Sequence, residues 1–219
     1  MDYSKLTDEE ILKLGKEKGL VSGKKYQIIY ADPPWSYNDK MKMEGIHGLI
    51  RGAESFYQTM DIEDIKKLPI NQISDDNCAL YLWCVPPLHQ QAMDVIVSWG
   101  FRYINYGFCW IKTTKNDKLH CGMGHYTRGN VELCLFAVKG RMANKVINHA
   151  IRQPIEAEIM RHSKKPEEIK KRIVDLFGDL SRIELFAREK SEGWDSIGNE
   201  INGKDIREEL KEIINKGIK

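Results

Sequence analysis

The strongest constraint on the fold is an apolar run that ends in a rigid acidic turn. Residues Tyr26–Ala31 are mostly apolar, with β-branched and aromatic side chains, and Asp32-Pro33-Pro34-Trp35 follows directly. A short run of this kind predicts a buried strand that carries Asp32 to the C-terminal edge of a sheet. Open α/β sheets bind their ligands at that edge. We therefore expect Asp32 to lie in a ligand site.

The two prolines determine what this turn can bind. Pro33 and Pro34 have no backbone N–H groups, so carbonyl oxygens are their only main-chain polar groups. With the Asp32 carboxylate they form an acceptor-only cradle that suits an amino group, and Trp35 offers a flat face for a base. Such a cradle would serve methylation of an exocyclic amine, because a carboxylate stabilises the positive charge that develops on the nitrogen. The alternative is a structural turn, with Asp32 as a cap and Trp35 in the core.

The composition limits the classes of protein to which the chain can belong. Its 219 residues suit one α/β domain, and 34 Lys and Arg against 32 Asp and Glu give a net charge of +2. A nucleic-acid-binding surface would therefore be a local patch. No segment has the roughly 18 apolar residues of a membrane helix, and the N-terminus does not resemble a signal peptide. The five cysteines form no C-x-x-C pair, which argues against a zinc site or a disulfide framework.

Helix and turn signals divide the chain into alternating elements. We expect a short helix over residues 7–18, a helix of about two turns from Asp61, and helices over 88–99, 166–177 and 204–216. Strands are expected at 79–83, 101–112, 131–138 and 182–187. Strands that alternate with helices predict a mostly parallel sheet.

Three loops without hydrophobic periodicity connect these elements, over residues 36–60, 113–130 and 139–153. The first follows the acidic turn and is expected to act as a lid over a bound base. The other two are basic and are expected to hold nucleic acid near the turn, with Lys115, Lys118 and Arg128 on phosphates. Solvated surface is the alternative for both. The six histidines are not spaced like metal ligands, so no metal site is expected.

An ordered set of motifs resembles that of the MT-A70 family, whose members transfer a methyl group from S-adenosylmethionine to adenine N6. The resemblance runs from about Tyr26 to Ile201 and begins with Asp32-Pro33-Pro34-Trp35 as the catalytic motif. The motifs that follow are Leu82-Trp83, Trp99-Gly100-Phe101, Trp110-Ile111-Lys112, Gly122-x-Gly124-His125-Tyr126, Glu132-Leu133-Cys134-Leu135, His162-Ser163-x-Lys165-Pro166, Glu184-Leu185-Phe186-Ala187-Arg188 and Gly193-Trp194-Asp195-x-Ile197-Gly198-Asn199-Glu200.

The resemblance implies an α/β, Rossmann-like methyltransferase fold. It would have a mostly parallel sheet with helices on both faces, and a permuted order in which the catalytic strand precedes the cofactor strand. One methyltransferase domain would span residues 1–219, with a helical extension over 1–24, a catalytic core over 25–201 and a helix over 202–219. The protein is expected in the cytoplasm, with no membrane contact. It would be associated with the nucleoid if it is bacterial, or it would be encoded by a phage.

The resemblance also assigns cofactor contacts. The residues that it implies around S-adenosylmethionine are Lys165, Glu184, Phe186, Arg188, Asn199 and Glu200. Lys165 and Arg188 can pair with a carboxylate, and Asn199 can meet a ribose or an adenine edge. For Lys165 and Arg188 the alternative is an ordinary surface ion-pair set. Family members often carry an acidic segment before the catalytic strand, whereas residues 14–25 offer only Glu17.

The function expected on these grounds is methylation of adenine N6 in DNA. The residues expected to meet the substrate are Tyr57, Lys112, Lys115, Lys118, Arg128 and Glu132. Two alternatives stay open, an RNA adenosine N6 methyltransferase and a non-catalytic partner subunit that binds nucleic acid. A nicotinamide-dependent oxidoreductase is excluded, because the turn after the first strand has no G-x-G-x-x-G fingerprint. A homodimer or a partner subunit is left open.

Overall fold

The computed structural model describes residues 24–36, 59–116, 118–122, 126–160 and 164–215. The expected helix over 7–18, Tyr57 and nearly all of the loop over 36–60 lie outside these ranges. Within them, no helix is long and apolar enough to cross a bilayer.

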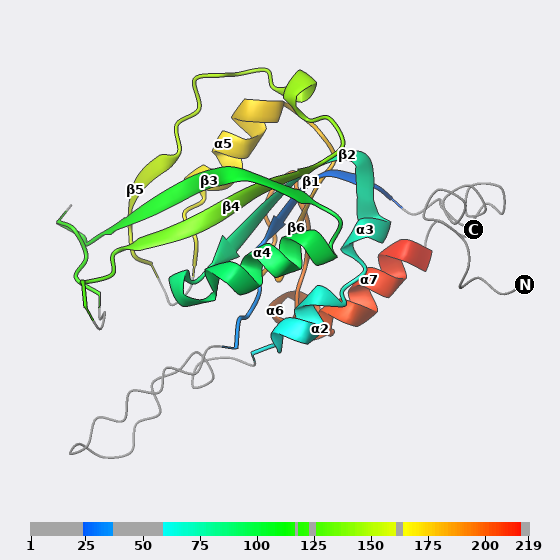
Figure 1. The fold of residues 1–219 in the computed structure, drawn as a ribbon, viewed down its shortest axis with the longest axis horizontal. Helices are drawn as coiled ribbons and strands as arrows, with labels where there is room; N and C mark the ends of the chain where they lie inside the picture. Colours follow the sequence, from blue (N-terminus) through cyan, green and yellow to red (C-terminus); the bar gives the residue numbers. More distant parts are fainter. Residues whose placement is uncertain (1–23, 37–58, 117, 123–125, 161–163, 216–219) are drawn as a thin grey trace, which may run out of the picture.

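A seven-stranded sheet forms the centre of the protein, in the order β5-β3-β4-β2-β1-β6-β7 (Figure 1). The strands are β1 (Tyr26–Ala31), β2 (Ser74–Cys84), β3 (Arg102–Thr113), β4 (Val131–Lys139), β5 (Pro154–Glu158), β6 (Arg182–Leu185) and β7 (Asp195–Ile197). Strand β4 runs antiparallel to both of its neighbours, β2 and β3, and the other pairings are parallel. The predicted α/β class with a mostly parallel sheet is confirmed.

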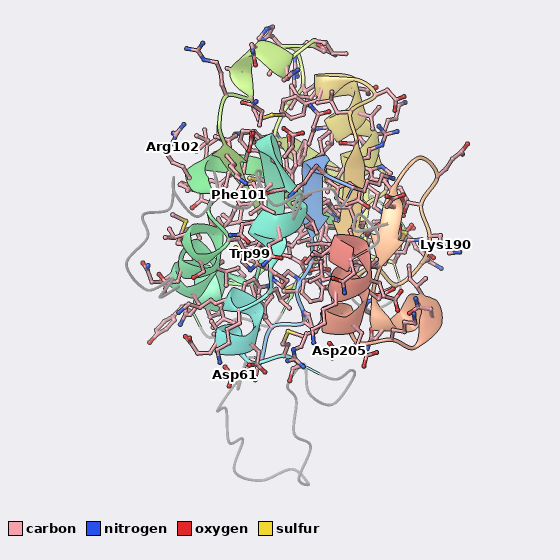
Figure 2. The ribbon with its side chains drawn as sticks, turned by 90° about the vertical axis from the view of Figure 1, so that its right-hand side faces the viewer. Asp61, Trp99, Phe101, Arg102, Lys190 and Asp205 are labelled. Carbon is pink, nitrogen blue, oxygen red and sulfur yellow. The ribbon has the colours of Figure 1, made fainter. Side chains whose placement is uncertain are left out.

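Helices cover both faces of this sheet. They are α2 (Ile62–Lys66), α3 (Ile70–Ile73), α4 (His89–Ser98), α5 (Glu168–Phe177), α6 (Asn199–Asn202) and α7 (Ile206–Asn215). Figure 1 shows α5 on one face and α2, α4 and α7 on the other. Trp99 and Phe101, just after α4, lie in the interior, whereas Arg102 lies at the periphery (Figure 2). This layering is consistent with a Rossmann-like methyltransferase fold.

Strand β1 shows why the sequence folds in this way. Ile29 and Ala31 face the apolar cluster shared with α4 and α7, while Ile28 and Tyr30 face the cluster shared with α5. Both faces are buried, so the strand reads as one continuous apolar run. Strand β1 pairs with β2 on one side and β6 on the other, in the interior of the sheet. Asp32 therefore directly follows a strand that is paired on both sides and buried on both faces.

Candidate active site

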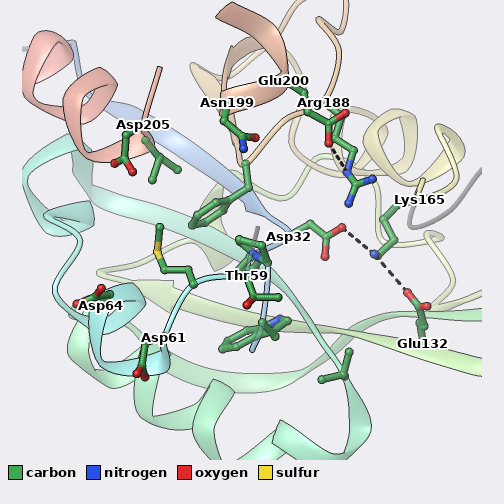
Figure 3. Close-up of a pocket in the computed structure, with 18 of the residues that line it drawn as sticks. Asp32, Thr59, Asp61, Asp64, Glu132, Lys165, Arg188, Asn199, Glu200 and Asp205 are labelled. Carbon is green, nitrogen blue, oxygen red and sulfur yellow. Dashed lines mark hydrogen bonds and ion pairs between the residues drawn. The ribbon is translucent and has the colours of Figure 1, made fainter. Parts of the chain in front are cut away.

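A cavity of about 990 Å³ opens at the C-terminal edge of β1. All four residues of the turn, Asp32-Pro33-Pro34-Trp35, line it (Figure 3). Segments far apart in sequence form the rest of the wall, including Lys112, Glu132, Lys165, Phe186, Arg188, Asn199 and Glu200. The structure thus brings eleven of the predicted site residues into one cavity. Catalytic and binding roles for these residues stay predictions.

The turn is fixed by hydrogen bonds on both sides. Trp35 is 4% exposed, and its indole N–H donates to the Trp83 carbonyl at 3.0 Å. The Pro33 carbonyl accepts from the Trp35 N–H, and the Pro34 carbonyl accepts from the Met60 N–H, each at 2.8 Å. Trp35 therefore anchors the turn in the core as well as lining the cavity, and each proline carbonyl keeps a second lone pair for a ligand.

Four charged side chains of alternating sign form a chain of ion pairs across the cavity. We call them the charge network, and its members are Asp32, Lys165, Glu132 and Lys112. Lys165 Nζ lies 2.7 Å from Asp32 Oδ2 and 3.4 Å from Glu132 Oε2 (Figure 3). Lys112 Nζ lies 2.6 Å from Glu132 Oε1. Lys165 also sits 5.2 Å above the centre of the Trp83 ring. Asp32 is thus held by a buried cation, and within the described ranges no backbone N–H donates to its carboxylate.

Burial and the neighbouring charges shift the pKa of each group in this network in opposite directions. Burial raises the pKa of Asp32, and Lys165 opposes that rise without cancelling it. Burial alone would lower the pKa of Lys165, but Asp32 and Glu132 together hold it above its usual value. Burial would raise the pKa of Glu132, yet Lys165 and Lys112 hold it below its ordinary range. Lys165 is therefore firmly cationic, while Asp32 is the carboxylate that takes a proton most readily.

The expected cofactor residues divide into two groups. Five of them line the main cavity, namely Lys165, Phe186, Arg188, Asn199 and Glu200. There Arg188 Nε lies 3.4 Å from Glu200 Oε1 (Figure 3). Glu184 instead lines a small adjoining cavity of about 40 Å³, with Lys170 Nζ at 2.7 Å. Side chains alternate along a strand, so Glu184 points to the α5 side while the turn after β6 brings Phe186 to the cavity.

Phe186 is held in an unusual backbone conformation by its neighbour Gly198. Its φ of 61° is rare for a residue with a bulky side chain. A Cβ atom on Gly198 would lie 2.2 Å from the Ala187 carbonyl oxygen and 2.7 Å from the Ala187 nitrogen. The Ala187 N–H also donates to the Ile197 carbonyl at 2.9 Å. This close backbone contact fixes the direction in which Phe186 enters the cavity.

We predict that Gly198→Ala disrupts this turn. The added methyl group has no room, so Phe186 and Ala187 must move away from β7 at a cost of about 1–3 kcal/mol in unfolding free energy. Urea unfolding followed by circular dichroism measures that loss. Gly129→Ala serves as the control, because a Cβ atom there would have no other atom within 4 Å and the backbone does not have a positive φ. A Gly198→Ala protein as stable as the wild type would contradict the close contact.

The expected substrate residues are spread more widely. Lys112 and Glu132 line the cavity, and Lys115, Lys118 and Arg128 are exposed on the loop that follows β3 at the same edge. The loop over 139–153 was expected near the turn, and this is wrong. It starts at the opposite edge, where Lys139 Nζ donates to Ser74 Oγ and the Arg141 N–H donates to Asn77 Oδ1. The reason is the antiparallel direction of β4.

Several stretches of the cavity wall were not named as site residues from the sequence. Thr59 and Met60 come from the end of the loop that was expected to form a lid, and Asp61 and Asp64 follow them in the wall. Val85, Ile159, Met160 and the segment 203–207 apart from Lys204 line the cavity as well. Asp61 was recognised only as the start of a helix, and its side chain does accept from the Glu63 N–H at the N-cap of α2. Among the described residues, no group of His, Cys, Asp and Glu is arranged to hold a metal ion.

Comparisons with known proteins point to one family. The MT-A70 family model matches residues 26–200. The "Type II methyltransferase M.MunI" of a Mycoplasma species is 34% identical over 189 residues, which cover 81% of this chain and 78% of that protein. The "N(6)-adenosine-methyltransferase catalytic subunit METTL3" of Homo sapiens is 28% identical over 185 residues, which cover 82% of this chain and 29% of that protein. The "N(6)-adenosine-methyltransferase MT-A70-like" of Arabidopsis thaliana is 27% identical over 199 residues, covering 89% and 25% respectively. The chain thus spans less than a third of these two eukaryotic relatives.

Proposed function

Because the chain belongs to the MT-A70 family, we propose that it methylates the N6 amine of adenine in nucleic acid, with S-adenosylmethionine as the methyl donor. The observation that carries this proposal is the position of Asp32. It stands at the end of β1, an interior strand of the sheet, and lines a cavity that Phe186, Arg188 and Asn199 also line. A cavity of about 990 Å³ is large enough for a cofactor and a flipped base together.

The residues present fit S-adenosylmethionine, which supplies an electrophilic methyl group when bound. Arg188 offers a guanidinium that can hold a carboxylate by charge-assisted hydrogen bonds. Asn199 offers both a donor and an acceptor for a ribose or a purine edge. Phe186 offers an apolar ring against which an adenine can lie. Glu200 pairs with Arg188 and would orient its guanidinium. Glu184 would accept hydrogen bonds from polar groups of the cofactor, from the small adjoining cavity.

We assign the acceptance of the adenine amine to Asp32. Its Oδ2 is bonded to Lys165, so Oδ1 is the oxygen that would accept an N–H of the amine, and a proline carbonyl would accept the other. The carboxylate stabilises the positive charge that develops on N6. Its raised pKa then makes it a suitable acceptor for the proton that leaves the nitrogen. Lys165 and Glu132 keep it in one orientation throughout.

We propose DNA as the substrate in preference to RNA. The relative at 34% identity is named as a type II methyltransferase, and the match covers most of the length of that protein. In contrast, the match covers less than a third of the human adenosine methyltransferase subunit. A base in a duplex must leave the stack to reach Asp32. We further propose one catalytic domain over 25–201, with 1–24 and 202–219 as extensions, acting in the cytoplasm either as a homodimer or with a partner subunit.

Mass spectrometry of nucleosides tests this function. Purified protein is incubated with S-adenosylmethionine carrying a labelled methyl group and with duplex DNA, single-stranded DNA or RNA in separate reactions. We expect labelled N6-methyladenine in DNA and none when Asp32→Ala replaces the wild type. Label in RNA alone would move the assignment to the RNA alternative. No label on adenine in any nucleic acid would reject the proposal.

The loop after β3 gives a prediction for nucleic-acid binding. Replacing Lys115, Lys118 and Arg128 with glutamine should weaken DNA binding and lower the slope of log affinity against log salt by about 0.7–0.9 for each lost phosphate contact. Fluorescence anisotropy at several salt concentrations measures that slope. The matched control removes Arg141, Lys145 and Arg152, which carry the same charge on the loop that starts at the opposite edge of the sheet. If the two triple variants weakened DNA binding equally, the total positive charge would matter and the position of the loop after β3 would not, which would contradict the prediction.

A further inference from the structure

One end of the active-site cavity is formed by a segment that the family match does not include. The match ends at residue 200, whereas Gly203, Asp205, Ile206 and Arg207 all line the cavity. These residues form the entry to α7, so this helix contributes part of the wall. The family model therefore does not cover this segment.

Helix α7 is a fixed part of the fold. Ile206 is 4% exposed and Leu210 is fully buried, and both belong to the core cluster that also contains Ile29 of β1 and Val95 of α4. Gly203 ends α6 in a left-handed conformation, with φ of 74°, and turns the chain into α7. The apolar face of α7 thus holds its N-terminal end against the cavity.

An ion pair joins this end of α7 to the opposite wall. Arg207 Nη2 lies 2.9 Å from Asp64 Oδ2 of α2, a residue 143 positions earlier in the chain. Arg207 Nη1 lies 3.4 Å from Asp205 Oδ2, and Asp205 Oδ1 accepts from the Arg207 N–H at 2.7 Å. Arg207 is therefore held between a carboxylate on each side of it. We call Asp64, Asp205 and Arg207 the clasp.

The clasp and the charge network lie at different ends of the cavity. Figure 3 shows Asp64 and Asp205 on the side away from Lys165 and Glu132. Figure 2 shows Asp61 and Asp205, which stand at the starts of α2 and α7, at the same end of the molecule. A ligand whose carboxylate meets Arg188 would extend its uncharged half past Asn199 towards the clasp.

We propose that the clasp closes the adenosine end of the cofactor site and slows release of the cofactor. This inference rests on the proposed function, because it places the carboxylate of S-adenosylmethionine at Arg188. The apolar cluster packs α2 and α7 into the fold, and the ion pair between them holds the two walls together at the cavity only while both charges are present. Loss of either charge lets the walls separate, so the bound adenosine loses contacts and leaves sooner.

Binding of S-adenosylhomocysteine to purified full-length protein tests the clasp. Arg207→Ala and Asp64→Asn should each raise its dissociation constant about two- to fivefold, the range for a half-exposed ion pair, through faster dissociation in stopped-flow measurements. The double variant should lose no more than either single variant, since both remove the same pair. Arg207→Lys, which keeps the charge, should stay close to the wild type. Glu212→Gln, which breaks an ion pair with Lys204 further along α7, is the matched control and should bind normally.

Adenosine alone serves as the second probe. If the clasp closes the adenosine end, Arg207→Ala weakens adenosine by the same factor as S-adenosylhomocysteine. Unchanged binding of both probes in the two single variants, additive losses in the double variant, or an effect on S-adenosylhomocysteine without one on adenosine would each overturn the inference. A wild type that binds no S-adenosylhomocysteine would reject the proposed function itself, which is a different outcome from equal binding by wild type and variants.

Discussion

Asp32→Asn should lower the rate of methyl transfer by at least a hundredfold and leave the affinity for S-adenosylmethionine within about twofold. Removing one group that stabilises charge in the transition state typically costs about 10²–10³ in kcat. Asparagine keeps the shape of the side chain but has lost the negative charge and one acceptor. Its N–H groups would also oppose the amine that the cradle is built to accept.

Single-turnover methylation of DNA and calorimetric binding of S-adenosylmethionine measure the two effects separately. Asp75→Asn is the control, because Asp75 is an aspartate at the start of β2, at the other edge of the sheet. Its Oδ1 accepts from the Asn77 N–H, and asparagine can make the same bond. If Asp32→Asn retained a near-normal rate while folded, Asp32 would not be the group that meets the amine.

The wild-type pH profile gives an independent view of the same carboxylate. Burial raises the pKa of Asp32, so its proton is taken up at a higher pH than by an ordinary aspartate. The acid limb of the methylation rate is therefore expected above the usual aspartate range.

Local signals in the sequence were enough to predict the elements that position the turn. Strand β1 is buried on both faces and appears as an unbroken apolar run, and it ends at the predicted residue, Ala31. Helix α2 begins at Ile62, next to Asp61, where a helix start was predicted. Helices α4, α5 and α7 form over segments whose apolar residues recur at helical spacing. In each case the neighbours along the chain supply most of the information.

Short elements and strand direction could not be predicted in the same way. Strands β5 and β7 and helices α3 and α6 have three to five residues, too few for a periodic pattern, and the sheet or its neighbours hold them in place. Nothing in the sequence of β4 states that it runs antiparallel. That direction decides where the loop over 139–153 begins, so a basic loop expected beside the turn starts at the far edge.

The pairing of Lys165 with Asp32 illustrates the limit for the site. The sequence predicted that both residues would line one pocket, and they do. Lys165 was assigned to a cofactor carboxylate, whereas its nearest anion is Asp32, 133 residues away along the chain. Only the folded arrangement of β1 and the segment before α5 reveals that contact. Lys165 therefore also holds the carboxylate of Asp32.

Lys165→Met should destabilise the protein and reduce methyl transfer together. The Lys165 side chain is only 11% exposed and bonds two carboxylates, so its removal leaves Asp32 without its closest cation and Glu132 with Lys112 alone. Breaking a fully buried ion pair costs about 3–5 kcal/mol. Asp32 and Glu132 keep about a quarter of their side-chain surface exposed, so we expect roughly 2–3 kcal/mol here. Methyl transfer falls as well, because Asp32 loses the contact that orients it.

Urea unfolding at neutral pH measures the loss, with Lys165→Arg as the control that keeps the positive charge. In the double variant Lys165→Met with Asp32→Asn, part of the stability should return. Of the two carboxylates that lose Lys165, the one at position 32 is then replaced by a neutral amide. Additive losses in that double variant would show that Lys165 stabilises the fold through packing on Trp83 and not through Asp32.

The pH dependence of stability separates charge from packing more sharply. In the wild type the pKa of Glu132 is lowered, so its stabilising effect is present above the ordinary glutamate pKa and is lost as the pH falls through the lowered value. Without Lys165, burial should raise the pKa of both carboxylates above their unfolded values. The folded variant then binds more protons than the unfolded chain, and its stability rises as the pH falls through that window. The difference between wild type and Lys165→Met should therefore shrink in acid. A difference that stays constant from neutral pH to pH of about 4 would mean that Lys165 acts through its apolar stem alone.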